Sequence, residues 1–98
     1  MSLLVRYTLK SADGHDAQAA AMQNLVAGLK GEGVDVHYSC FATDQPTEFI
    51  GLLEFETDAG KQTFLDSAAF AAYRTTVGPT FANPPQTTDI AAIASTRD

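Results

Sequence analysis

Aromatic rings that carry hydroxyl groups are the side chains of this chain best suited to bind or activate a small molecule. Three tyrosines, Tyr7, Tyr38 and Tyr73, can both donate and accept hydrogen bonds. The alternation and helical spacing around them predict that they face one interior together with Phe55 and Phe64. A cavity walled by these five rings would suit a flat ligand. The alternative is that the rings simply fill the core, where most large side chains go.

Two other residues, His37 and Arg74, are weaker candidates for chemistry, whereas Cys40 and His15 are not expected to take part in it. His37 lies on a predicted strand in the opposite phase, so it faces away from that interior and is a weak candidate for a general base. Arg74 follows Tyr73 near a predicted helix end, where it complements the helix dipole, forms a surface ion pair, or anchors a ligand. Cys40 has no basic neighbour in sequence and is expected to be a buried, inert thiol. His15 is expected to be solvated at a helix start.

Several common kinds of site are not indicated. The two histidines and one cysteine show no metal-binding spacing, so no metal is expected. Gly31-Glu32-Gly33 closes a helix instead of opening one, which is the wrong position for a phosphate loop. No Gly-x-Ser-x-Gly elbow is present. Nucleotide and ordinary hydrolase chemistry are therefore not expected, and the sequence predicts no cofactor.

Composition and charge favour a small acidic domain without nucleic-acid or membrane partners. The 98 residues suffice for one core, so residues 1–98 are expected to form a single domain. Twelve acidic and six scattered basic residues give a net charge of −6, which leaves no basic face for phosphate or lipid. No apolar run could span a bilayer, and the first residues do not resemble a signal peptide. A cytoplasmic location is expected.

The elements that must position the aromatic residues follow from hydrophobic periodicity. Strands have a hydrophobic period of two residues and helices a period of 3.6. The predicted order is a strand at 3–10, a helix at 15–30, strands at 34–42 and 48–56, a second helix, and a strand at 87–95. The second helix is expected to start at 58, to break near Ser67 and to stop before 78. In the second helix, Phe64, Leu65, Ala72 and Tyr73 are expected on the buried stripe. This βαββαβ order predicts a ferredoxin-like α+β fold, with both helices on one face of a four-stranded antiparallel sheet.

The sheet face without helices is too apolar for water. Its strand phases carry six apolar residues, namely Leu4, Phe41, Ile50, Leu52, Ala91 and Ile93. A second copy packed face to face is the simplest cover, and two-fold pairing is the commonest symmetry. The sequence therefore predicts a homodimer through the open sheet face.

Two stretches of the chain resemble the antibiotic biosynthesis monooxygenase family of the dimeric α/β barrel superfamily. They are Glu54-Phe55-Glu56-Thr57 and the helix Phe64-Leu65-Asp66-Ser67-Ala68-Ala69-Phe70-Ala71-Ala72-Tyr73, and Asp13-Gly14 and Gly31-Glu32-Gly33 also fit. The resemblance implies a dimer with a ligand cavity between helices and sheet. The family includes cofactor-independent oxygenases of quinols or polycyclic phenols, haem-degrading enzymes, and proteins without a known role.

The chain departs from this family at positions that matter for activity. Phe55 stands where the family has tryptophan, Phe64 where it has histidine, and Ala69 where a further histidine is common. Haem-degrading members use Asn, Trp and His where this chain has Tyr7, Phe64 and Arg74, so haem chemistry is not expected. Two hypotheses follow: an oxidoreductase, namely a cofactor-independent monooxygenase of a small aromatic or quinol, or a non-catalytic dimeric small-ligand-binding or stress-related protein.

Overall fold

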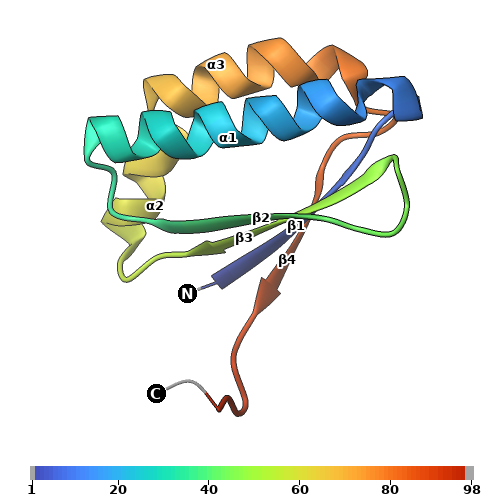
Figure 1. Ribbon diagram of the computed structural model, residues 1–98. Coiled ribbons are helices and arrows are strands. Elements are labelled where there is room, and N and C mark those ends of the chain that lie inside the picture. Colours follow the sequence, from blue (N-terminus) through green and yellow to red (C-terminus); the bar gives the residue numbers. More distant parts are fainter. Residues whose placement is uncertain (1, 97–98) are drawn as a thin grey trace.

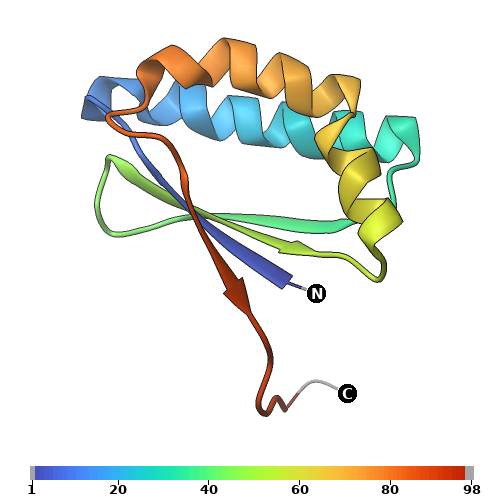
Figure 2. The ribbon, with the colours of Figure 1, turned by 180° about the vertical axis from the view of Figure 1, so that it is seen from behind.

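Four antiparallel strands form one sheet, and helices cover only one of its faces (Figures 1 and 2). The computed structural model describes residues 2–96. In chain order the strands and α-helices are β1 (Ser2–Thr8), α1 (His15–Glu32), β2 (His37–Ala42), β3 (Glu48–Glu54), α2 (Asp58–Leu65), α3 (Ala68–Val77) and β4 (Gln86–Ile90). The strand order in the sheet is β2-β3-β1-β4. The predicted ferredoxin-like α+β fold is confirmed.

The last strand is shorter than the sequence predicts. Alternation favours a strand through Ser95, but β4 ends at Ile90, which pairs with Ser2 at the start of β1. The described part of β1 therefore offers no residue opposite positions 91–96. The placement of Ala91 and Ile93 on the sheet is wrong: both lie outside β4, and Ile93 is fully exposed. The C-terminal segment leads away from the sheet (Figure 1).

One stripe of α1 packs onto the sheet. Ala21, Met22, Leu25 and Leu29 are buried, and Gln18 joins them as a buried polar residue that periodicity did not predict. The helix ends where Gly33 adopts a φ of 69°, a conformation that glycine adopts without a Cβ penalty. No helix within residues 2–96, including the 18-residue α1, is both long enough and apolar enough to cross a membrane.

The second predicted helix is divided at Asp66–Ser67, as expected. The hydroxyl of Thr57 caps α2 by accepting from the Gly60 N–H, and the hydroxyl of Ser67 caps α3 by accepting from the Phe70 N–H. The break changes the helical phase, so Phe64 and Tyr73 are buried but Leu65 and Ala72 are exposed. The predicted burial of Phe64 and Tyr73 is confirmed, whereas that of Leu65 and Ala72 is wrong.

A carboxylate from α1 joins the end of that helix to the start of α3. The two oxygens of Glu32 accept from the backbone N–H groups of Ala68 at 3.0 Å and Ala69 at 2.8 Å, where the α3 dipole is positive. Nearby, a Cβ added to Gly28 would lie 2.7 Å from the Cβ of Ala69, so the two helices touch closely there. Together these contacts set the spacing of the helical layer above the sheet.

The sheet has one buried face and one partly exposed face. Val5, Tyr7, Phe49 and Leu53 point towards the helices and are at most 6% exposed. On the other face Leu4, Ile50 and Leu52 are only half-buried, and Phe41 is 50% exposed. Polar residues interrupt this open face, among them an ion pair between Arg6 and Glu48.

Candidate ligand cavity

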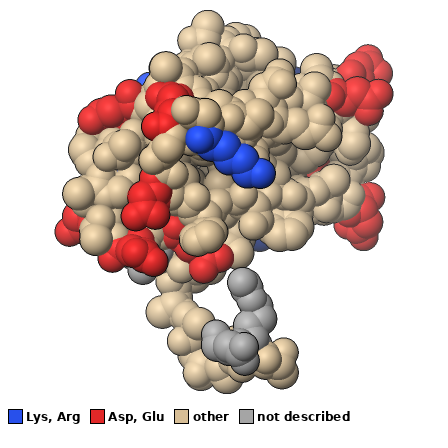
Figure 3. All heavy atoms as spheres, turned by 60° about the vertical axis from the view of Figure 1, so that its left-hand side comes forward, with Lys and Arg blue, Asp and Glu red and all other residues tan. Residues whose placement is uncertain are grey.

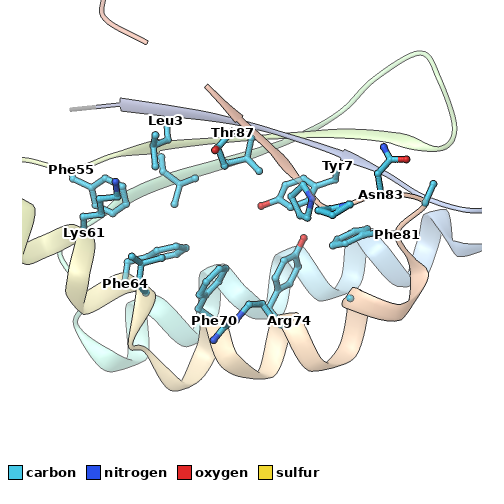
Figure 4. A pocket seen from close by; sticks show the side chains of 18 of the residues that line it. Leu3, Tyr7, Phe55, Lys61, Phe64, Phe70, Arg74, Phe81, Asn83 and Thr87 are labelled. Carbon is cyan, nitrogen blue, oxygen red and sulfur yellow. The ribbon is translucent and has the colours of Figure 1, made fainter. Parts of the chain in front are cut away.

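A hollow of about 640 Å³ lies between the helices and the sheet. Side chains from β1, β3, α2, α3 and the segment before β4 line it, as Figure 4 shows. Most of the wall is apolar or aromatic, including Leu3, Val5, Leu53, Phe55, Phe64, Phe70 and Phe81. This volume is within the range of cavities that hold small organic ligands. The five rings predicted from the sequence therefore do not fill the interior.

Four of the five predicted rings line this cavity. Tyr7, Phe55, Phe64 and Tyr73 contribute to its wall. Tyr38 does not, although its hydroxyl oxygen lies 3.2 Å from that of Tyr7. The structure thus brings Tyr38 to the wall through a hydrogen bond rather than through direct exposure to the cavity.

The tyrosine hydroxyls are held by specific neighbours. The Gln18 Nε2 amide donates to the Tyr73 hydroxyl at 2.7 Å, and the Tyr7 and Tyr73 rings meet edge to face with centroids 6.1 Å apart. Gly51 on β3 provides the room for this cluster, because a Cβ there would lie 2.9 Å from Cε1 of Tyr38 and 3.3 Å from Cε2 of Tyr7. The absence of a side chain at position 51 therefore allows Tyr38 and Tyr7 to adopt these positions.

Burial keeps the acidic side chains of this cluster protonated. It raises the pKa of Tyr7, Tyr38 and Tyr73 above the ordinary tyrosine value, and the neighbouring Tyr7 hydroxyl raises the pKa of Tyr38 further. Burial also raises the pKa of Cys40, which is a free, half-buried thiol. At neutral pH the three hydroxyls can donate hydrogen bonds, but they cannot act as anionic bases.

Two further rings that sequence reasoning missed complete the aromatic wall. Phe70 stacks on Phe64 with centroids 4.6 Å apart, and Phe81 lies 5.4 Å from the Tyr7 ring. Phe70 points inward because α3 starts anew after the Ser67 cap. Recognising Ser67 as a helix cap would therefore have predicted the inward direction of Phe70. Phe81 comes from an irregular segment and has no periodic signal.

Arg74 lies at the cavity and packs on an aromatic ring. Its guanidinium carbon is 4.8 Å from the centroid of Phe70, a cation–π contact, and it occupies the last turn of α3. No carboxylate of residues 2–96 forms an ion pair with it. Within residues 2–96 the position of Arg74 agrees with the dipole and ligand-anchoring roles considered from the sequence, and no surface ion pair is found there.

Neither histidine reaches the cavity. His37 is exposed and pairs in register with Glu54 on the open side of the sheet. His15 is not simply solvated, because its ring packs 4.9 Å from that of Phe49. No Asp, Glu or His of the described chain is part of the cavity wall. The wall formed by the described residues therefore offers hydrogen-bond donors and cations but no carboxylate or imidazole base.

Comparisons with known proteins show which fold this is. No family model matches the chain, and no curated protein does. Solved structures do match over nearly the full length of both chains. A structure named antibiotic biosynthesis monooxygenase is 14% identical with a TM-score of 0.81, covering 95% of this chain and 98% of its own. SnoaB, a cofactor-independent oxygenase from Streptomyces nogalater, is 10% identical with a TM-score of 0.77, covering 99% and 96%.

A protein of unknown function from Nitrosomonas europaea is similar to the same degree. It is 18% identical with a TM-score of 0.79, covering 99% of this chain and 92% of its own. The protein therefore has the ferredoxin-like α+β fold of structures named antibiotic biosynthesis monooxygenases, as the sequence resemblance predicted. Proteins with this fold include a named oxygenase and one without a known function, so the fold alone assigns no activity.

Proposed function

We propose that this protein is a cofactor-independent monooxygenase that binds a flat, electron-rich aromatic such as a quinol in its cavity. The observation that carries the proposal is a hollow walled by aromatic rings into which protonated tyrosine hydroxyls are built. The fold shared with SnoaB, a cofactor-independent oxygenase, gives further support. The chemistry in such a site comes mainly from the substrate.

The side chains would bind, orient and exclude water. Phe64 and Phe70 offer an aromatic surface for the substrate ring, while Tyr7 and Tyr73 line the wall with hydroxyls that can donate to a substrate oxygen. Because no base lines the described wall, the substrate loses its phenolic proton to solvent, and the donors stabilise the resulting anion. The overall reaction balances as a quinol plus O₂ giving a hydroxyquinone plus water, with all four electrons supplied by the substrate.

Oxygen consumption with a panel of quinols and polyphenols tests this proposal. We expect consumption above the rate of spontaneous oxidation, and a loss of about tenfold or more in kcat for Tyr7→Phe, because one oxyanion donor is removed. His37→Gln should leave the rate unchanged, since His37 lies on the other face of the sheet. A panel without consumption above background contradicts the oxygenase proposal.

A non-catalytic small-ligand-binding protein is the second candidate. The observation that favours it is the lack of any carboxylate or imidazole in the wall formed by residues 2–96. This candidate predicts that aromatic ligands bind in the cavity, as measured by calorimetry, while no oxygen is consumed. Oxygen consumption that Tyr7→Phe abolishes would exclude it.

We also propose that the protein forms a homodimer through the open sheet face. Leu4, Ile50 and Leu52 are only half-buried there, and Phe41 is 50% exposed, so a second copy would remove apolar surface from water. The support now comes from β1, β2 and β3, since Ala91 and Ile93 lie outside the sheet. Sedimentation velocity should give the dimer mass.

A further inference from the structure

The charges around the cavity have the opposite sign to those of the whole chain. Twelve acidic residues outnumber six basic ones, yet three of those six, Lys10, Lys61 and Arg74, line the cavity. No described acidic residue does. Asp89, which pairs with Leu3 in register, is not part of the wall. A random distribution of these charged residues would place more carboxylates than cations at the cavity wall.

These three cations have no acidic partner within residues 2–96. The described ion pairs are Arg6 with Glu48 and His15 with Asp16, and both lie elsewhere. Lys61 extends beside Phe55, whereas Arg74 lies beside Phe70 (Figure 4). In the surface view of Figure 3, a patch of basic atoms lies near the middle of the face, and acidic side chains lie on both sides of it.

Helix electrostatics does not account for the position of Lys61. A cation is favourable in the last turn of a helix, which suits Arg74 in α3. Lys61, however, is the fourth residue of α2, near the positive end of that helix dipole, where a cation is unfavourable. A half-buried lysine with an unfavourable helix position and no carboxylate partner indicates a requirement for positive charge at the cavity.

We propose that the natural ligand of this cavity is an aromatic anion, a flat ring system that carries a carboxylate or similar acidic group. The rings of Phe64 and Phe70 contact its apolar body, and Lys61 and Arg74 attract its acid group. Cations at an apolar wall act more strongly than in bulk water, because the low-dielectric surroundings reduce screening. This inference rests on the ligand-binding part of the proposed function and adds the charge of the ligand.

Probes of the same ring system and nearly the same shape, one charged and one neutral, test the inference. Naphthoate and naphthamide share one ring system and nearly one shape, and isothermal titration calorimetry measures the affinity of each for the intact protein. We expect naphthoate to bind about tenfold more tightly, because two partly exposed cations at the cavity attract its carboxylate. K61Q/R74Q should remove this preference and leave naphthamide binding within about twofold of the original protein.

Lys30→Gln is the matched control, because it removes the same charge from α1 at an exposed position outside this cavity. It should leave naphthoate affinity unchanged, whereas added salt should weaken naphthoate more than naphthamide. Equal affinity for both probes in the original protein overturns the anion proposal and leaves aromatic binding intact. An equal loss in Lys30→Gln also overturns it, because net charge would then suffice. If neither probe binds, both the anion proposal and the proposal that the cavity binds aromatic ligands fail.

Discussion

Replacing Gly51 by alanine tests whether the tyrosine cluster depends on a missing side chain. In the folded protein the new Cβ would lie 2.9 Å from Cε1 and 3.1 Å from the hydroxyl of Tyr38, and 3.3 Å from Cε2 of Tyr7. Carbon atoms in contact prefer about 3.5–4.0 Å, so the Tyr38 ring must move by more than half an ångström. That movement would disturb the 3.2 Å hydrogen bond between Tyr38 and Tyr7.

The expected change in the free energy of unfolding is the sum of two costs and one smaller gain. Overpacking costs about 1–3 kcal/mol, and a lost hydrogen bond costs about 0.5–1.5 kcal/mol. Alanine in a strand interior regains about 0.5–1 kcal/mol relative to glycine. We therefore expect Gly51→Ala to lower the free energy of unfolding by about 2 kcal/mol, equivalent to about 10 °C in Tm for a domain of this size.

Urea unfolding followed by far-UV circular dichroism measures this change. Gly31→Ala is the matched control, because Gly31 is an exposed helical residue with no atom near an added Cβ, and it should stabilise the protein by about 0.8 kcal/mol. In a Tyr38→Leu background, Gly51→Ala should cost much less, since the two closest atoms, Cε1 and the hydroxyl of Tyr38, are gone and only the 3.3 Å approach to Tyr7 remains. A Gly51→Ala protein more stable than the original, or an equal penalty in both backgrounds, refutes the reasoning.

Three further predictions concern the tyrosines, the link between α1 and α3, and the open sheet face. Burial raises the pKa of every tyrosine above 10.0. When the pH first exceeds about 10, the tyrosines of the unfolded chain therefore ionise while those of the folded protein stay protonated. The free energy of unfolding should fall as the pH rises above about 10, while the phenolate absorbance of the folded protein stays low. A normal folded-state titration would disprove this burial effect. Glu32→Ala should lower the free energy of unfolding by about 1 kcal/mol, because two N–H groups of α3 lose their acceptors; the exposed Glu56→Ala is its control, and equal losses in urea unfolding would argue against the cap. Phe41→Glu places a charge on the open face and should give a monomer by sedimentation with unchanged circular dichroism; a persisting dimer would locate the interface elsewhere.

Local periodicity was sufficient to predict the order of the elements along the chain and the buried face of β1 and β3. Val5 and Tyr7 alternate with polar or half-buried neighbours, as do Phe49 and Leu53, and all four lie under the helices. The length of β4 could not be predicted in this way. Residues 91–95 alternate well enough for a strand, but within residues 2–96 the pairing with β1 ends at Ser2 opposite Ile90, and that pairing is a non-local property.

Only part of the cavity wall could be predicted for the same reason. Tyr7 and Tyr73 lie in regular elements, so their spacing indicates their direction. Phe81 reaches the cavity because irregular backbone from residues 80–82 bonds to residues 8–10, through Lys10 N–H to Thr80 O and Ala82 N–H to Thr8 O. No periodic pattern encodes such long-range hydrogen bonds. Lys61 was overlooked because a lysine in the first turns of a helix gives no periodic signal that it faces a cavity.

Every tyrosine of the chain lies at or next to the cavity wall, and the chain has no tryptophan. All intrinsic fluorescence of the native protein beyond the weak phenylalanine signal therefore originates within the proposed binding region. A bound aromatic that absorbs tyrosine emission would quench it by energy transfer without any attached label. The protein thus carries its own optical reporter of occupancy, and mutation of Tyr7 or Tyr73 would change the reporter together with the site.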